Sequence, residues 1–258
     1  MGLGILKQSL FVFRQFFFDP VSVMRRWMSI PSFVMNLRQY RRLQHDDFFS
    51  FRLRDLYFST HDRFGDAATV DRHYFHQDIW AAKLIYGSGV RNHVDIGSRV
   101  DGFVAHLLLF CTVTYVDIRT LSVITESLRY SEGSVLDLPF ADNSVHSLSC
   151  LHVIEHIGLG RYGDQVNPQG HELAARELRR VLKPGGMLLV STPVGRERLC
   201  FDAHQVFDPS TVIGMFFDLN LVEFSLIPDA EGRIIQNAPI ELARSCEYGC
   251  GLFRFTKK

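Results

Sequence analysis

The chain has 258 residues, with 28 Lys and Arg against 28 Asp and Glu, and 47% of its residues are hydrophobic. This composition excludes global disorder, and the zero net charge argues against a nucleic-acid-binding protein that works by bulk charge. A chain of this length can bury a core without disulfides or a structural metal. The five cysteines are scattered, so we interpret them as buried free thiols of a cytoplasmic protein, and the lone C-x-x-x-C of Cys246 and Cys250 is weak evidence for a metal site.

Residues 1–45 differ from the rest of the chain because they combine many basic and aromatic side chains with one acid, Asp19. Two interpretations stay open: an amphipathic segment that contacts an anionic membrane surface or a partner, and a helical layer packed on the main domain. Pro20 and Pro31 predict boundaries between short helices. No stretch offers the ~18 uninterrupted apolar residues of a spanning helix, and no signal-peptide cleavage pattern is found. We therefore expect a cytoplasmic protein, with peripheral attachment at the inner membrane as a further hypothesis.

From about residue 74 the pattern changes to alternating helices and strands. Helical spacing of apolar residues covers 74–85 before Gly87 and Gly89 stop it, and two further helices are expected at 103–110 and 170–182. Apolar runs predict strands at 93–97, 112–118, 128–138, 145–151, 187–192, 221–227 and 251–256. This order predicts an α/β fold: a Rossmann-like, doubly wound, mainly parallel seven-stranded sheet with an antiparallel edge strand. The expected domains are an N-terminal helical segment, 1–73, and an α/β domain, 74–258.

Polar residues gather where the predicted strands end, and ligands of such sheets bind at the carboxyl ends of the strands. They are Asp95, Asp117, Ser134, His152, Glu155, His156 and Thr192. Asp117 follows Asp95 by 22 residues (117 − 95), close to the ~20-residue offset of an acid that accepts the ribose hydroxyls of a nucleoside. The alternative is that Asp117 is only a loop residue or a helix cap.

Several segments, taken together and in order, resemble the motifs of class I S-adenosylmethionine-dependent methyltransferases. They are His93–Gly97, Tyr115–Asp117, Leu138–Ser144, Leu151–His156 and Leu178–Gly186. The resemblance covers roughly residues 74–258. The stretch Glu155–Asp164 further resembles a branch associated with bacterial surface-polysaccharide biosynthesis.

The resemblance implies S-adenosyl-L-methionine as the cofactor and assigns roles to single residues. Asp95, Gly97 and Ser98 lie in the first loop, beside the methionine part of the cofactor. Asp117 takes the ribose hydroxyls. The adenine edge is expected at Ser134 and Val135. His152 faces both the cofactor and the methyl-transfer pocket; the residues implied at the cofactor are thus Asp95, Gly97, Ser98, Asp117, Ser134, Val135 and His152.

The sequence departs from the family pattern in two places. The usual Gly-x-Gly after the first acid lacks its middle glycine, since Gly97 is followed by Ser98 and Arg99, and a glycine returns only at Gly102. Ser134 stands where an Asp usually bonds the adenine amine, and Asp137 is a candidate substitute. The short connection between the second and third strands further predicts a turn in place of a helix. These departures motivate an alternative: a catalytically inactive methyltransferase-like fold that serves as a scaffold or partner-binding subunit.

The implied reaction is methylation of a small-molecule or glycan-type acceptor, with oxygen as the expected atom. A hydroxyl acceptor calls for a general base, and the candidates are His152, His156, His171 and His204. We favour His152 or His204, with Glu155 or Tyr162 orienting a partner. Each histidine could also be a purely structural one. The run from His152 to His156 matches the H-x-x-E-H zinc-hydrolase pattern, but it follows a strand and lacks the helix that such a site needs. Asp164 with Glu155 is thin evidence for a divalent ion. No metal site is predicted.

Overall fold

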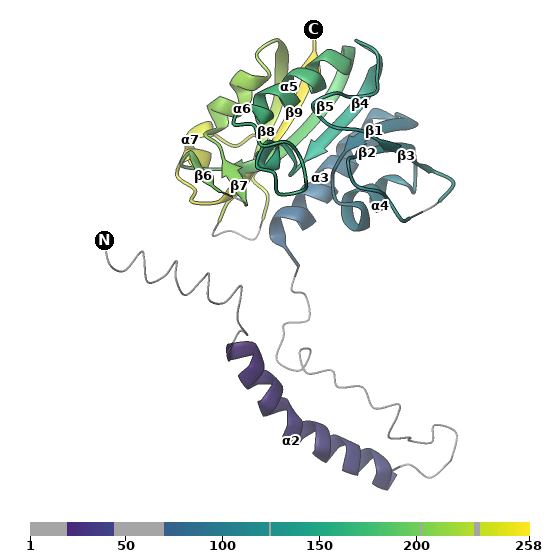
Figure 1. Ribbon diagram of the computed structural model, residues 1–258, viewed down its shortest axis with the longest axis vertical. Coiled ribbons are helices and arrows are strands. Elements are labelled where there is room, and N and C mark those ends of the chain that lie inside the picture. Colours follow the sequence, from purple (N-terminus) through teal and green to yellow (C-terminus); the bar gives the residue numbers. More distant parts are fainter. Residues whose placement is uncertain (1–19, 44–69, 124, 202, 230–232) are drawn as a thin grey trace. The chain divides into compact units, whose positions relative to one another are not determined.

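The computed structural model describes residues 20–43, 70–123, 125–201, 203–229 and 233–258. The chain divides into two compact units, Met1–Val70 and Asp71–Lys258 (Figure 1). The division that we expected after residue 73 lies three residues inside the second unit. His73 therefore belongs to the α/β unit.

The described part of the N-terminal unit is one helix, α2 (Pro20–Leu43). Pro20 begins this helix as predicted, but the boundary predicted at Pro31 is wrong, because the helix continues through it. Apolar and basic side chains do not separate onto two faces of α2, so this stretch lacks the expected amphipathic character. The other residues of the 1–45 segment lie outside the described residues. Within the described chain, no helix is both long and apolar enough to cross a membrane.

The second unit is built on a seven-stranded sheet with the order β3-β2-β1-β4-β5-β9-β8 (Figure 1). The first five strands of this order are parallel, and β9 runs antiparallel to both of its neighbours. The strands are β1 (Asn92–Ile96), β2 (Thr112–Asp117), β3 (Leu128–Glu132), β4 (Val145–Leu151), β5 (Leu182–Val194), β8 (Leu219–Ile227) and β9 (Gly249–Lys257). The predicted fold class is confirmed, with the antiparallel strand next to the edge strand β8.

Helices cover both faces of this sheet because successive strand residues point to opposite sides. On one face, α3 (Arg72–Ser88), the π-helical turn η3 (Val100–Val104) and α4 (Ala105–Leu107) pack against residues such as Leu252. On the other face, α5 (Gly170–Val181) and α6 (Pro209–Met215) pack against residues such as Phe253, which follows Leu252 in β9. The two cores hold the carboxyl ends of the parallel strands at one edge of the domain.

Several boundaries differ from the sequence predictions. The third strand ends at Glu132 rather than near residue 138, and β5 begins directly after α5 and runs through the Lys183–Gly186 stop signal. The short elements β6 (Arg198–Cys200), β7 (His204–Val206), η4 (Ile154–His156) and α7 (Ile240–Arg244) were not predicted. The described residues between β2 and β3 contain no helix, as expected from the short connection.

Candidate functional site

A cavity opens where β1, β2, β3 and β4 end. Its lining residues come from the ends of those strands and from the loops that follow them. They are Ile96, Gly97, Val116, Asp117, Ile118, Arg119, Gly133, Ser134, Val135, Leu136, His152, Val153, His156, Ile157, Tyr162 and Asp164. The cavity thus lies at the carboxyl edge of the parallel strands, where doubly wound sheets bind their ligands. Five of the predicted cofactor residues meet here: Gly97, Asp117, Ser134, Val135 and His152.

Gly97 keeps the floor of this cavity open. Its φ of 65° is in the region that favours glycine. A Cβ at this position would lie 3.3 Å from Val153 Cγ2 and 3.9 Å from Asp117 Oδ2, so it would stand between the first loop and the acid. The backbone can therefore approach a ligand closely at Gly97 although the middle glycine of the usual motif is missing.

Asp117 ends β2 and has both carboxylate oxygens engaged. Arg119 donates to Oδ1 through Nε at 3.0 Å and to Oδ2 through Nη2 at 2.8 Å, and Tyr115 donates its hydroxyl to Oδ2 at 3.0 Å. Burial raises the pKa of Asp117, but these bonds outweigh it and hold the pKa below its usual value. The Arg119 guanidinium also lies over the Tyr162 ring, 4.7 Å from its centroid. The carboxylate of Asp117 can accept further donors only when Arg119 moves away.

The loop after β3 presents the groups that the resemblance assigns to adenine. Ser134 Oγ accepts the Leu136 N–H at 3.1 Å, which leaves one lone pair of the hydroxyl for another donor. Val135 and Leu136 line the cavity beside it. Asp137, the candidate substitute for the missing acid, is not among the lining residues.

The first loop is held together by buried polar groups. Ser98 donates its hydroxyl to Asp95 Oδ1 at 2.6 Å and accepts the Leu151 N–H at 3.1 Å, which ties β1 to β4. Burial raises the pKa of Asp95 to about 6, although hydrogen bonds from Ser149 and Ser98 oppose it. Asp95 and Ser98, both expected at the cofactor, are almost fully buried and do not line the cavity. Arg99 pairs with Asp101 at 2.6 Å and does not line the cavity either.

Gly102, the glycine that returns late in the first loop, is needed where η3 approaches α3. A Cβ on Gly102 would collide with the Asp78 carboxylate of α3. The glycine therefore allows η3 and α3 to pack closely. Its role is in packing, away from the cavity.

His152 and Glu155 form a buried pair after β4. His152 has a φ of 53°, an uncommon conformation for a non-glycine residue, and its Nδ1 lies 2.7 Å from Glu155 Oε1. Burial lowers the pKa of His152, but the charges of Cys250 and Glu155 outweigh it and raise the pKa well above its usual value. Burial raises the pKa of Glu155, and the charge of His152 overrides it and lowers that pKa. Residues that hold unusual backbone conformations often serve a site.

His204, the second candidate base, lies at the start of β7 and does not line the cavity. It belongs to a series of neighbouring rings: its centroid is 5.0 Å from Tyr248, which lies 5.4 Å from His73, which lies 5.9 Å from His152. Burial lowers the pKa of His204. Its chain neighbour Ala203 accepts a hydrogen bond at 2.7 Å from Nδ1 of His156, a cavity residue.

Two residues of this region, Arg119 and His73, were not singled out from the sequence, and Cys250 was named only as half of a C-x-x-x-C pair that is weak evidence for a metal site. Arg119 had one usable signal, since it stands two residues after the predicted ribose acid.

Asp164 has its carboxylate engaged by backbone N–H groups of its own loop, at 2.7 Å from Gly158 and 3.3 Å from Tyr162. These bonds hold the loop from Gly158 to Asp164 together.

Comparisons with known proteins identify the fold. The model of a family described as "Caenorhabditis protein of unknown function, DUF268" matches residues 120–231. A search of the curated proteins finds no match. Among solved structures, the N-methyltransferase NodS from Bradyrhizobium japonicum, in complex with S-adenosyl-l-homocysteine, matches with a TM-score of 0.50 at 18% identity, over 70% of this chain and 85% of that one. The chain has the Rossmann-like methyltransferase fold.

Two further structures show how far this likeness reaches. A chain from the complex of the Haloferax volcanii Trm112 methyltransferase activator with its methyltransferase matches with a TM-score of 0.51 at 16% identity, over 71% of this chain and 89% of that one. The cyclase SpnF matches with a TM-score of 0.50 at 12% identity, over 70% and 81%. Because these similar chains include a cyclase, the reaction has to be argued from the site.

Proposed function

We propose that this chain is an S-adenosylmethionine-dependent methyltransferase that acts on a small-molecule or glycan-type acceptor, on oxygen. The observation that carries the proposal is the cavity at the ends of β1 to β4, with Asp117 at the end of β2 and Gly97 opposite. The fold similarity to methyltransferases supports it. Cofactor residues are assigned as follows: Asp117 to the ribose hydroxyls, Ser134 and Val135 to the adenine edge, and Gly97 to the close approach of the backbone.

The cofactor supplies an activated methyl group, and the chain has to align an acceptor atom about 3 Å from it, which provides much of the rate by proximity. A hydroxyl acceptor also has to lose its proton. His152, oriented by Glu155, and His204, beside Tyr248, are the proposed bases. Loss of turnover with unchanged cofactor binding in His204→Ala would assign the step to His204; unchanged turnover would exclude it.

The acceptor side of the site suits a ring-shaped substrate. Each of three histidines of this region has a tyrosine ring beside it: the ring centroids are 5.1 Å apart for Tyr74 and His152, 5.5 Å for Tyr162 and His156, and 5.0 Å for Tyr248 and His204. Tyr162 and Tyr248 are about one-third exposed, at 38% and 37%. Aromatic faces provide large apolar contact area while their hydroxyls remain available as partners. This arrangement, together with the resemblance of Glu155–Asp164, supports a glycan-type acceptor from surface-polysaccharide biosynthesis.

The cofactor assignment is tested by isothermal titration of the purified full-length chain with S-adenosylhomocysteine. We expect one site per chain. Asp117→Ala should weaken binding by a charge-assisted hydrogen bond, ~1.5–3 kcal/mol or roughly 10- to 150-fold.

The matched control is Asp137→Ala, which removes a nearby acid that does not line the cavity and should leave the affinity unchanged. A folded wild-type chain that shows no binding at millimolar ligand would contradict the proposal and favour the scaffold alternative. Equal losses in both variants would contradict the role of Asp117.

We also propose a cytoplasmic location in which residues 1–45 attach the enzyme to the inner membrane. The basic and aromatic composition of this segment supports attachment to an anionic surface. Two basic residues, Arg41 and Arg42, stand in the last turn of α2.

A further inference from the structure

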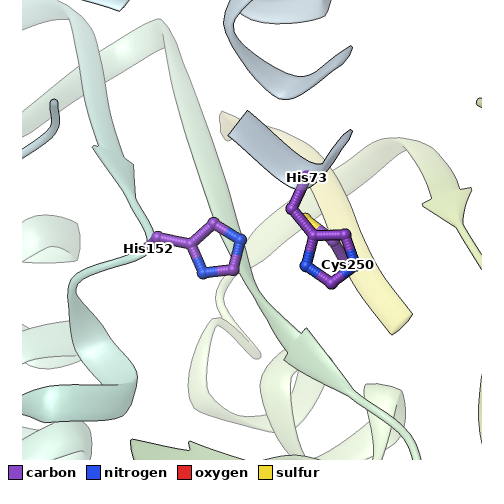
Figure 2. Close-up of side chains that lie close together, drawn as sticks. All are labelled: His73, His152 and Cys250. Atoms are coloured by element: carbon purple, nitrogen blue, oxygen red, sulfur yellow. The ribbon is translucent and has the colours of Figure 1, made fainter. Parts of the chain in front are cut away.

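Three side chains with metal-binding atoms meet next to the cavity, although they are far apart in the sequence. His73 lies in the first turn of α3, His152 follows β4, and Cys250 lies in β9 (Figure 2). One ligand atom from each of them lies within 4.8 Å of those of the other two. His152 and Cys250 are buried and His73 is partly buried, so the group is largely shielded from water.

His152 points an unsatisfied atom toward this group. Its Nε2 is buried and has no hydrogen-bond partner among the described residues, while the side chain as a whole is only 5% exposed. Figure 2 shows the imidazole directed toward His73 and Cys250. Because buried polar atoms normally have a partner, a ring nitrogen without one that faces a thiol and a second imidazole is available to bind a ligand.

Glu155 supplies the outer partner that metal-bound histidines usually have. Its carboxylate lies 2.7 Å from Nδ1, the other ring nitrogen of His152, and keeps a proton on that atom, so an ion would bind at Nε2 by displacing the proton there. The charges also balance, since a divalent ion, the Cys250 thiolate and the Glu155 carboxylate sum to zero. Such a balance matters because an uncompensated buried carboxylate is costly.

We propose that His73, His152 and Cys250 bind one divalent transition-metal ion, with Zn²⁺ the best match, and that Glu155 is a positioning residue. Two imidazoles and one thiolate suit Zn²⁺, which binds nitrogen at ~2.0 Å and sulfur at ~2.3 Å. Tetrahedral coordination at these lengths places the ligand atoms about 3.3–3.5 Å apart, so the three side chains would draw together by about 1 Å. Three protein ligands leave one position open, as in catalytic rather than structural zinc sites.

This site differs from the zinc pattern in the sequence. Of the two histidines in the run His152 to His156, only His152 takes part, because His156 Nδ1 donates to the Ala203 carbonyl at 2.7 Å. Cys246, the other half of the C-x-x-x-C pair, donates its thiol to the Leu242 carbonyl at 3.6 Å. The site is therefore assembled by the fold, and metal binding there does not depend on the proposed methyl transfer. A metal-bound His152 has no ring nitrogen left to accept a proton, so an occupied site leaves His204 as the proposed base.

The test uses the full-length chain, stripped with EDTA and titrated with Co²⁺ while absorbance is recorded, followed by displacement with Zn²⁺. We expect one equivalent to bind, with a thiolate-to-cobalt charge-transfer band in the near ultraviolet. Cys250→Ser should abolish this band. His73→Ala should weaken binding at least 100-fold, and Glu155→Gln should weaken it 10- to 100-fold while keeping the band.

Cys246→Ser and His171→Ala are the matched controls, because Cys246 is buried and His171 also has an unpartnered buried ring nitrogen. Both should keep the wild-type stoichiometry and band. Circular dichroism and a cooperative thermal transition establish that each variant folds. If Cys250→Ser does not fold, the result for His73→Ala decides, because His73 is only partly buried. The proposal is overturned if the folded wild-type chain binds no stoichiometric metal, or if the folded target variants bind it as tightly as the controls.

Discussion

At the level of single residues, Arg119 competes with a cavity ligand for the carboxylate of Asp117. Arg119 bonds both carboxylate oxygens of Asp117 and stacks on Tyr162, so it occupies the acid that a ribose diol would use. The Arg119 side chain is 55% exposed while that of Asp117 is 7% exposed, so water screens the pair from the arginine side and reduces its contribution to the free energy. We infer that the guanidinium swings away when a nucleoside binds.

Replacing Arg119 with alanine should therefore strengthen binding of S-adenosylhomocysteine. Removing a partly exposed pair worth ~0.5–1 kcal/mol predicts a gain of roughly two- to fivefold, measured by isothermal titration. Arg161→Ala is the control, because Arg161 also lies over the Tyr162 ring, at 5.1 Å, but does not bond Asp117. Weaker binding in Arg119→Ala would mean that the guanidinium contacts the ligand itself.

At the level of elements, a buried polar bridge joins β1 to β4 beneath the cavity. His93 on β1 bonds Ser147 at 2.7 Å and Ser149 at 2.8 Å on β4, and Ser149 in turn donates to Asp95. Burial lowers the pKa of His93 to about 3, so the ring stays neutral in the folded protein. The unfolded chain takes up a proton below pH ~6.5, and stability is lost as the pH falls from there toward 3.

His93→Gln should remove this pH dependence. The unfolding free energy of wild type minus that of His93→Gln should fall by about 2 kcal/mol between pH 7.5 and pH 5, because glutamine does not titrate. Asp95 has the opposite effect on the pH dependence, because its raised pKa makes stability fall as the pH rises from about 4 to 6. Wild type and His93→Gln both contain Asp95, so its effect cancels in the difference between them.

Urea unfolding at several pH values measures the difference between the two proteins. Ser147→Ala removes one hydrogen bond but keeps the imidazole, so its stability should follow the wild-type pH dependence. Curves for wild type and His93→Gln that stay parallel from pH 7.5 to 5 would show that His93 is not held neutral in the folded state.

Sequence patterns located these elements better than they located their ends. The parallel strands were recognisable because buried strands read as apolar runs between turn residues. The stop signal at Lys183–Gly186 did not interrupt the sheet, and Pro31 did not end α2. Hairpin β6–β7 was missed because its short strands lack an apolar run and depend on contacts with η4 and β5.

At the scale of the whole molecule, the chain joins an α/β unit to a basic N-terminal unit, and membrane attachment is the property to test. Flotation of the full-length chain with vesicles containing anionic lipid should exceed flotation with neutral vesicles. The double variant Arg38→Glu and Arg42→Glu should reduce flotation severalfold, since each basic residue near the surface contributes ~1 kcal/mol. A double variant that floats like wild type would dismiss attachment through this helix.

The sequence by itself determined the class of fold and the position of Asp117 and Ser134 at strand ends, because hydrophobic periodicity and the chain order of loops are local properties. It placed Asp95 and Ser98 at the cofactor, whereas the structure buries both. Only the tertiary structure brought His73 and Cys250 to His152 and laid Arg119 against Asp117. The contacts of His152 depend on where the fold places α3 and β9, and the contact of Arg119 depends on the orientation of its side chain. Neither property leaves a periodic signal in the sequence.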